Sequence, residues 1–291
     1  MSDPVLALDD IKGCKRLVNR NILVTAGTLG KLYFSSVVCD EICLGIGRAI
    51  VERCIQEGAN VFLCSRKRTN VENTVNCLRE KYSTNKVGGC ACNVGNETQL
   101  RNFLDRSYEF FSDCQHKKPE EIIINGIVAS QAVSPHFGMT YDMDDGAYQK
   151  IMQLNLESYW KLVKLAKPRL SSGTSVIFNA SVGGFMPTPP LGLYCVSKTA
   201  LMSLARVLSI ELGRENIRVN TIAPGLVRTK MTERFWKYSD GEEMPSFKPT
   251  SLPRLGEPVD IAGPVAFLLS DDSAYLTGET IVVSGGIRSR V

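Results

Sequence analysis

Near its N-terminus the chain carries an apolar strand, a glycine-led helix and a second apolar strand, and this order restricts the fold more than any other feature. Residues 21–25 and 60–64 read as the two strands, and Gly45-Ile46-Gly47 opens a helix with one apolar side. Parallel strands need a crossover connection, which such a helix provides. The sequence therefore predicts a βαβ unit within an open α/β sheet.

The same glycines predict a ligand. Glycine at a strand-to-helix turn lets the main chain approach a pyrophosphate, and the helix N-terminus offers N–H donors and a positive dipole. We therefore expect Gly45, Ile46 and Gly47 to bind a dinucleotide.

The residues after the second strand indicate which dinucleotide is bound. NAD sites usually place an Asp or Glu there for the ribose hydroxyl, whereas this chain has Ser65-Arg66-Lys67-Arg68. A guanidinium binds phosphate through bidentate, charge-assisted hydrogen bonds. Ser65 and Arg66 therefore predict NADP(H), and an exposed basic turn is the alternative.

A second constellation predicts proton transfer. Tyr194 and Lys198 share one face of an expected helix, and Ser181 ends an apolar strand thirteen residues before the tyrosine. We expect the nearby ammonium to lower the phenol pKa, so that Tyr194 exchanges a proton with an alcohol or carbonyl near neutral pH. The same spacing at Tyr82 and Lys86 lies in a polar run and reads as a solvated turn.

Length and composition favour one domain. The 291 residues contain no linker or repeat, so residues 1–291 are expected to fold together. The net charge of +4 is scattered, which argues against a nucleic-acid surface. The ten cysteines lack zinc-type spacing, so we expect no metal and reduced thiols. No signal-peptide or membrane-length apolar run is present, and we expect a soluble intracellular protein.

Taken together, residues 21–286 resemble the short-chain dehydrogenase/reductase family, whose Asn–Ser–Tyr–Lys tetrad matches Asn155, Ser181, Tyr194 and Lys198. The resemblance implies a Rossmann-type, doubly wound, mostly parallel sheet with helices on both faces. It implies that Tyr194 is the general acid in carbonyl reduction, that Ser181 orients the carbonyl and that Lys198 holds the nicotinamide ribose. Asn155 would anchor the water of a proton relay, and a helix-kink residue is the alternative reading.

The resemblance also extends the expected cofactor site. Asn93-Val94 matches the pair that borders the adenine, and the segment from Asn220 to Thr229 resembles the one beside the nicotinamide carboxamide. Thr229 would contact that amide, unless it is only a helix N-cap. Further expected cofactor-binding residues, besides Tyr194 and Lys198, are Thr25, Gly27, Ser130, Pro224, Gly225 and Val227.

Within the family the chain most resembles the NADPH-dependent carbonyl and retinal reductase group, dehydrogenase/reductase family member four. This similarity implies apolar ketones or aldehydes (retinal-like or aromatic) as substrates and a homotetramer or homodimer as the assembly. The aromatic stretch 230–253, with Met231, Phe235, Trp236 and Phe247, lies where the family has its substrate lid, and ordinary loop packing is the alternative. Ser289-Arg290-Val291 is similar to the group's peroxisomal address, so a cytoplasmic or peroxisomal location is expected.

Two departures from the family pattern leave other functions open. Residues 29–43 interrupt the glycine loop, and deleting them restores an unbroken family motif, so we interpret them as a retained intron or a misassigned exon boundary. Ala129-Ser130-Gln131-Ala132 replaces the usual Asn-Asn-Ala-Gly, which puts local rigidity in question. The alternatives are a catalytically silent dinucleotide-binding protein and an enzyme similar to 3-oxoacyl-carrier-protein reductase.

Overall fold

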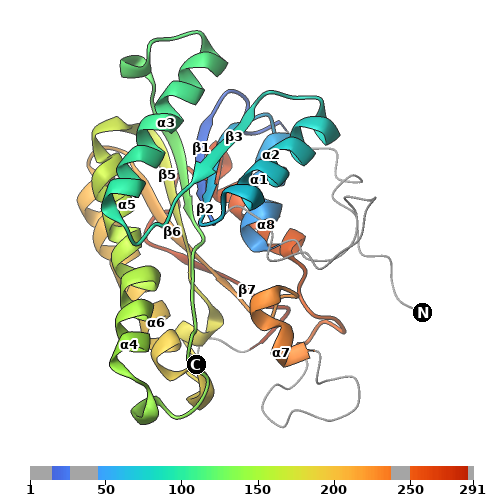
Figure 1. The fold of residues 1–291 in the computed structure, drawn as a ribbon, viewed down its shortest axis with the longest axis vertical. Coiled ribbons are helices and arrows are strands. Elements are labelled where there is room, and N and C mark those ends of the chain that lie inside the picture. Colours follow the sequence, from blue (N-terminus) through green and yellow to red (C-terminus); the bar gives the residue numbers. More distant parts are fainter. Residues whose placement is uncertain (1–14, 27–44, 237–249, 288–291) are drawn as a thin grey trace.

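A single sheet of seven parallel strands forms the centre of the molecule (Figure 1). The computed structural model describes residues 15–26, 45–236 and 250–287, so the interruption at 29–43 lies outside the described residues. The strands are ordered β3-β2-β1-β4-β5-β6-β7, and the expected doubly wound sheet is confirmed. Their bounds are β1 Asn21–Thr25, β2 Asn60–Ser65, β3 Val87–Ala91, β4 Ile124–Ala129, β5 Leu170–Asn179, β6 Arg218–Pro224 and β7 Thr280–Val283.

Helices cover both faces of this sheet (Figure 1). One apolar cluster joins one face to α1, α2 and α8, and a second joins the other face to α3, α5 and α6. A short helix, α7, precedes α8, while α4 runs into α5 through a π-helical turn at Gln153–Glu157. The helices are α1 Ile46–Gln56, α2 Arg68–Tyr82, α3 Glu97–Gln115, α4 Asp145–Met152, α5 Ser158–Ala166, α6 Gly192–Gly213, α7 Glu233–Trp236 and α8 Pro258–Leu269.

The strands alternate their side chains between these two layers. In β1, Ile22 and Val24 belong to the cluster with α1 and α8, whereas Leu23 belongs to the cluster with α3 and α6. All three are fully buried, and each such side chain contributes about 1.5–3 kcal/mol on burial. A strand buried on both faces needs apolar residues at every position, which explains the continuous apolar runs in the sequence.

The chain reverses its winding direction between β1 and β4. These neighbouring strands are parallel, with Thr25 opposite Ala129, but the strands that follow each of them lie on opposite sides. Ligands of open α/β sheets bind outside the carboxyl ends of the strands at such a switch point. The Ser130 N–H donates to Thr25 Oγ1 at 3.2 Å there and ties the two strand ends together.

The segment Pro189–Gly213, which contains α6, is long and apolar enough to cross a membrane by length and composition alone. Its apolar side instead packs on the sheet, where Leu201, Met202, Ala205 and Leu208 are buried in the core. The structure therefore uses this helix as a core element, and it carries Tyr194 in its first turn.

Candidate active site

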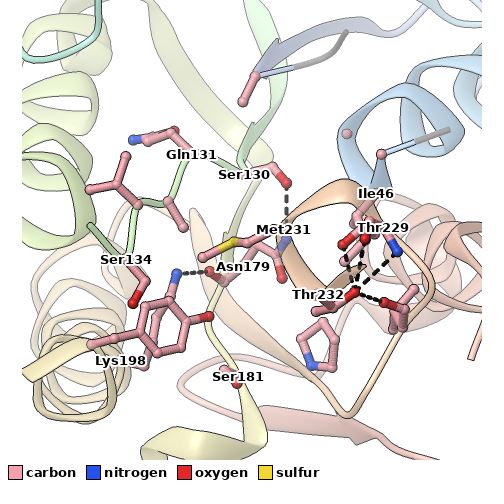
Figure 2. Close-up of a pocket in the computed structure, with 18 of the residues that line it drawn as sticks. Ile46, Ser130, Gln131, Ser134, Asn179, Ser181, Lys198, Thr229, Met231 and Thr232 are labelled. Carbon is pink, nitrogen blue, oxygen red and sulfur yellow. Dashed lines mark hydrogen bonds between the residues drawn. The ribbon is translucent and has the colours of Figure 1, made fainter. Parts of the chain in front are cut away.

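A cavity of about 1120 Å³ opens at the carboxyl ends of the strands (Figure 2). Its wall includes the residues that follow β2, β4, β5 and β6, together with Gly45 at the start of α1 and Tyr194 in α6. Segments far apart in the sequence therefore meet at the one edge of the sheet where a ligand was expected.

Tyr194 and Lys198 lie on the same side of α6 and both line this cavity. The Lys198 side chain is 1% exposed, and its Nζ lies 5.6 Å from the centroid of the Tyr194 ring. Its hydrogen bond goes to the main-chain oxygen of Asn179, at 2.7 Å. The amine of Lys198 is thus bonded to the end of β5 and lies over the ring of Tyr194.

Burial dominates the electrostatics of this pair. It lowers the pKa of the Lys198 amine from 10.5 to about 7, because burial in a medium of low polarity disfavours the charged form. It also raises the pKa of the Tyr194 phenol from 10.0 to about 12, with the Ser181 hydroxyl acting in the opposite direction. The expected lowering of the phenol pKa is therefore wrong. At neutral pH the phenol keeps its proton, and this is the form that donates a proton to a carbonyl oxygen.

Ser181 reaches the same wall from the end of β5. Its backbone is extended, and its Oγ accepts a hydrogen bond from the Gly183 N–H at 3.1 Å. That bond fixes the hydroxyl oxygen while leaving its proton available as a donor. Figure 2 shows Ser181 and Lys198 reaching the cavity from different elements.

Asn155 is not part of the cavity wall. It is fully buried in the π-helical turn between α4 and α5. Its Oδ1 accepts from Val133 N at 2.8 Å, and its Nδ2 donates to Val133 O at 3.0 Å and to Ser197 Oγ at 3.1 Å. The side chain therefore ties the loop after β4 to α6 and marks a helix irregularity. The proton-relay role stays a prediction.

The residues that replace the family motif at the end of β4 take part in a buried hydrogen-bond network. Thr25 Oγ1 donates to Gln131 Oε1, and Gln131 Nε2 donates to Ser158 Oγ at 2.8 Å. The main-chain oxygen of Gln131 accepts from the Tyr159 hydroxyl at 2.6 Å. Gln131 is 6% exposed. The larger side chain thus joins β1, β4 and α5, so the family asparagine is replaced by other polar ties.

Arg66 belongs to the part of the cavity wall that follows β2, which lies three strands away from β5 in the sheet. It lines the wall, is exposed, and has no hydrogen bond or ion pair within the described parts of the chain. Its neighbour Arg68 points elsewhere and pairs with Glu72 at 2.7 Å. A guanidinium without a partner among the described residues after β2, and Tyr194 with Lys198 beside β5, suit an elongated anionic ligand, so the residues present fit a nicotinamide dinucleotide.

The residues after β6 form a further part of the cavity wall. Gly225 N donates to Val283 O at 2.9 Å, and a Cβ added at Gly225 would meet Ser284 at 2.8 Å. Only glycine allows this close approach of β6 to the end of β7. Thr229 lines the cavity and also caps the turn Lys230–Thr232, with its N–H bonded to Thr232 Oγ1 at 3.1 Å. Both readings of Thr229 are therefore compatible with its position.

Most of the expected cofactor-binding residues are brought to this one cavity. Thr25 is buried behind the wall and bonds to Ser130 and Gln131. Gly27 lies outside the described residues. The expected residues that line the cavity are Gly45, Ile46, Gly47, Ser65, Arg66, Asn93, Val94, Ser130, Ser181, Tyr194, Lys198, Pro224, Gly225, Val227 and Thr229.

The cavity wall also contains apolar residues, and some of them were not expected from the sequence. The rings of Phe137, in the loop after β4, and Phe235, in α7, make an edge contact with centroids 5.6 Å apart. Met186 and Met231 line the same region. Met231 and Phe235 belong to the predicted lid stretch, whereas Phe247 and the Trp236 side chain lie outside the described residues. Phe137 and Met186 sit in loops without periodicity, so no sequence pattern places them.

The second Tyr/Lys match lies elsewhere, as expected. Tyr82 is not in a solvated turn but is the half-buried last residue of α2. Its hydroxyl donates to buried Glu52 Oε1 at 2.8 Å and accepts from Gln56 Nε2 at 3.0 Å, between α1 and α2. It has no place in the cavity wall.

This architecture, with a tyrosine, a lysine and a serine on one wall of a switch-point cavity, defines a class of dinucleotide-dependent enzymes. The chain matches the family model described as Enoyl-(Acyl carrier protein) reductase over residues 43–288. The protein belongs to the short-chain dehydrogenase/reductase family, whose members are oxidoreductases that bind nicotinamide dinucleotides.

Named relatives lie in the predicted group. The chain is 34% identical to Dehydrogenase/reductase SDR family member 4 of Caenorhabditis elegans, across 96% of this chain and 98% of the relative. It is 36% identical to the Homo sapiens protein of the same name, across 94% and 90%. The predicted family assignment is confirmed.

Solved structures give the same fold. A short-chain dehydrogenase/reductase from Brucella melitensis, titled glucose/ribitol dehydrogenase, matches with a TM-score of 0.74 and 25% identity, covering 96% of this chain and 99% of that one. A 3-oxoacyl-[acyl-carrier protein] reductase from Brucella melitensis matches with a TM-score of 0.76 and 21% identity, covering 99% and 98%.

Proposed function

We propose that the protein is an NADPH-dependent carbonyl reductase that acts on apolar ketones or aldehydes, of the retinal-like or aromatic kind. One observation carries the proposal: Arg66, which has no partner among the described residues, lines the same cavity as Tyr194, Ser181 and Lys198. Arg66 suits a phosphorylated nucleotide, and the other three residues suit proton transfer to a carbonyl.

Each residue of the wall has a defined task in the reduction. Bound NADPH supplies the hydride that reaches the carbonyl carbon. Ser181 donates a hydrogen bond to the carbonyl oxygen, and the neutral Tyr194 phenol delivers the proton to that oxygen as charge develops there. Lys198, which is held by Asn179 O, binds the nicotinamide ribose and stabilises the phenolate that remains.

The charge distribution around Arg66 favours NADP(H) over NAD(H). No carboxylate follows β2, where NAD sites usually hold the ribose diol, and Ser65, Arg66 and Lys67 line the cavity there. A planar guanidinium suits a phosphate monoester, and it gains nothing comparable from a neutral ribose.

The apolar wall supports the substrate class. Phe137, Met186, Met231 and Phe235 line the cavity that Tyr194 also lines. Apolar and aromatic walls with few convergent polar groups favour ligands whose bulk is hydrocarbon. The polar groups that remain, Ser181 and Tyr194, then orient one oxygen atom.

Assembly and location remain predictions. The homodimer or homotetramer and the peroxisomal or cytoplasmic location come from the family resemblance, and Ser289-Arg290-Val291 lies outside the described residues.

A panel of carbonyl compounds tests the proposed activity. Purified protein is assayed with aromatic ketones, retinal, small polar aldehydes and a 3-oxoacyl thioester, each with NADPH and with NADH. We expect turnover of the aromatic ketones and retinal, with NADPH preferred. Preference for the 3-oxoacyl thioester would instead support the alternative enzyme class.

A fluorescence titration with NADPH separates an enzyme from a silent binding protein. Binding without turnover on any carbonyl would favour the silent alternative. Because residues 29–43 interrupt the glycine loop, the same titration is made with a variant that lacks them. A tryptic peptide from the native protein that covers residues 32–48 would rule out the exon-boundary interpretation.

A further inference from the structure

Asn179 places an unsatisfied polar atom at the cavity. It is the last residue of β5, two positions before Ser181, so the alternation of an extended chain directs both side chains to the same side. Asn179 lines the cavity and is 8% exposed. Its Oδ1 is buried and has no hydrogen-bond partner among the described residues.

The other polar atoms of Asn179 are all engaged. Its Nδ2 donates to Ser130 Oγ at 2.9 Å, and its main-chain oxygen accepts from Lys198 Nζ at 2.7 Å and from the Tyr159 hydroxyl at 3.3 Å. These bonds hold the residue between the ends of β4 and α6 (Figure 2). Because Nδ2 is fixed on Ser130, Oδ1 is the amide atom left for a ligand.

Buried polar atoms in native proteins are almost always paired, so an orphaned acceptor in a ligand cavity indicates a missing donor. Lys198 lines the same cavity, and its amine is bonded to the main-chain oxygen of Asn179, so we look for a ligand group that can bind both residues. A sugar hydroxyl meets both needs, since it accepts from an ammonium and donates to an amide oxygen. A phosphate or a carbonyl oxygen lacks the proton.

We propose that Asn179 Oδ1 accepts a hydrogen bond from a hydroxyl of the ribose next to the nicotinamide, and so positions that half of the cofactor beside Tyr194. This inference rests on the proposed function. It adds a cofactor-contacting residue that the tetrad and the glycine loop do not contain, and it makes Ser130 the residue that orients the amide.

Three ligands that share one end test this assignment by isothermal titration. Adenosine 2′,5′-bisphosphate contains the adenosine half alone, 2′-phospho-ADP-ribose adds the second ribose, and NADPH adds the nicotinamide. The test variant is Asn179→Leu, which keeps the side-chain volume and removes the acceptor. We expect about a tenfold loss of affinity for the two longer ligands, as for one hydrogen bond, and unchanged affinity for the bisphosphate.

Each other result has a defined meaning. Unchanged affinity for NADPH, an equal loss for all three ligands, or a loss for NADPH alone overturns the ribose assignment. Failure of the unaltered protein to bind any of the three contradicts the proposed function itself. If Asn179→Leu does not fold, Asn179→Thr, which keeps a shorter acceptor, is compared in the same way and is expected to lose affinity for the same two ligands.

Discussion

The Lys198 amine lies 5.6 Å from the centroid of the Tyr194 ring, yet its hydrogen bond goes to Asn179 O and not to the tyrosine. The two side chains share one face of α6, and burial shifts their pKa values in opposite directions. Burial favours the neutral form of each group, so the pair forms a dry site in which proton transfer depends on the ligand that arrives.

The first prediction concerns stability and pH. The pKa of Lys198 falls from 10.5 in the unfolded chain to about 7 when folded. The unfolded state therefore holds this proton more tightly, and the free energy of unfolding rises with pH between these two values. Lys198→Met removes the destabilisation that comes from burying a protonated amine. This destabilisation amounts to roughly 4 kcal/mol at most near pH 7.

Urea unfolding of both proteins at about pH 7 and about pH 10 measures this effect. The advantage of Lys198→Met over the unaltered protein should be largest at the lower pH and should shrink as the pH rises. Parallel stability curves for the two proteins would show that the amine is not penalised by burial.

The second prediction concerns the choice of cofactor. Arg66→Glu replaces the unpaired guanidinium of the cavity wall with a charge that repels phosphate, so KM for NADPH should rise by tenfold or more, while KM for NADH changes little. Arg68→Glu is the matched control, because Arg68 belongs to the same turn but pairs with Glu72 outside the cavity. Equal changes for the two cofactors in Arg66→Glu would refute the NADP(H) assignment.

The third prediction concerns the residues that replace the family asparagine motif. Gln131→Ala removes one hydrogen bond each from buried Thr25 and Ser158, which keep their bonds to Ser130 N and Leu154 O, and this should lower the free energy of unfolding by about 1–3 kcal/mol. The exposed Gln149→Ala should change it by less than about 0.5 kcal/mol. Chemical denaturation measures the free energy of unfolding of both variants. Similar small losses in the two would mean that the hydrogen-bond network of Gln131 does not stabilise the fold.

The fourth prediction concerns the substrate. Phe235→Ala removes the ring that contacts Phe137 across the apolar wall, so KM for an aromatic ketone should rise about tenfold, with a much smaller change for a small aldehyde. Tyr141→Ala is the control, since Tyr141 is 83% exposed and does not line the cavity. A uniform effect on both substrates would show that the aromatic pair does not select for bulk.

The sequence predicts those features that a short pattern encodes. The apolar runs give the strands because a strand buried on both faces has few other compositions, and the spacing of Tyr194 and Lys198 gives a shared helix face. Ser181 could be placed because it directly ends such a run. These predictions depend on local geometry, which a single sequence determines.

Other features depend on packing between distant segments, which a single sequence does not carry. The direction of the Tyr194 pKa shift was predicted wrongly because the neighbouring charge was considered without its burial. Asn179 was passed over, although a polar residue at the end of an apolar strand was a usable signal. Phe137 meets Phe235 only in the folded chain.

The most direct test of the central claim uses NADPH in which both hydrogens at C4 of the nicotinamide are replaced by deuterium, with an aromatic ketone as substrate. Mass spectrometry of the product should show one deuterium on the carbinol carbon. Tyr194→Phe should lower this turnover by about 10²–10⁴-fold and leave the affinity for NADPH unchanged. A product without deuterium, or undiminished turnover in Tyr194→Phe, would contradict the account.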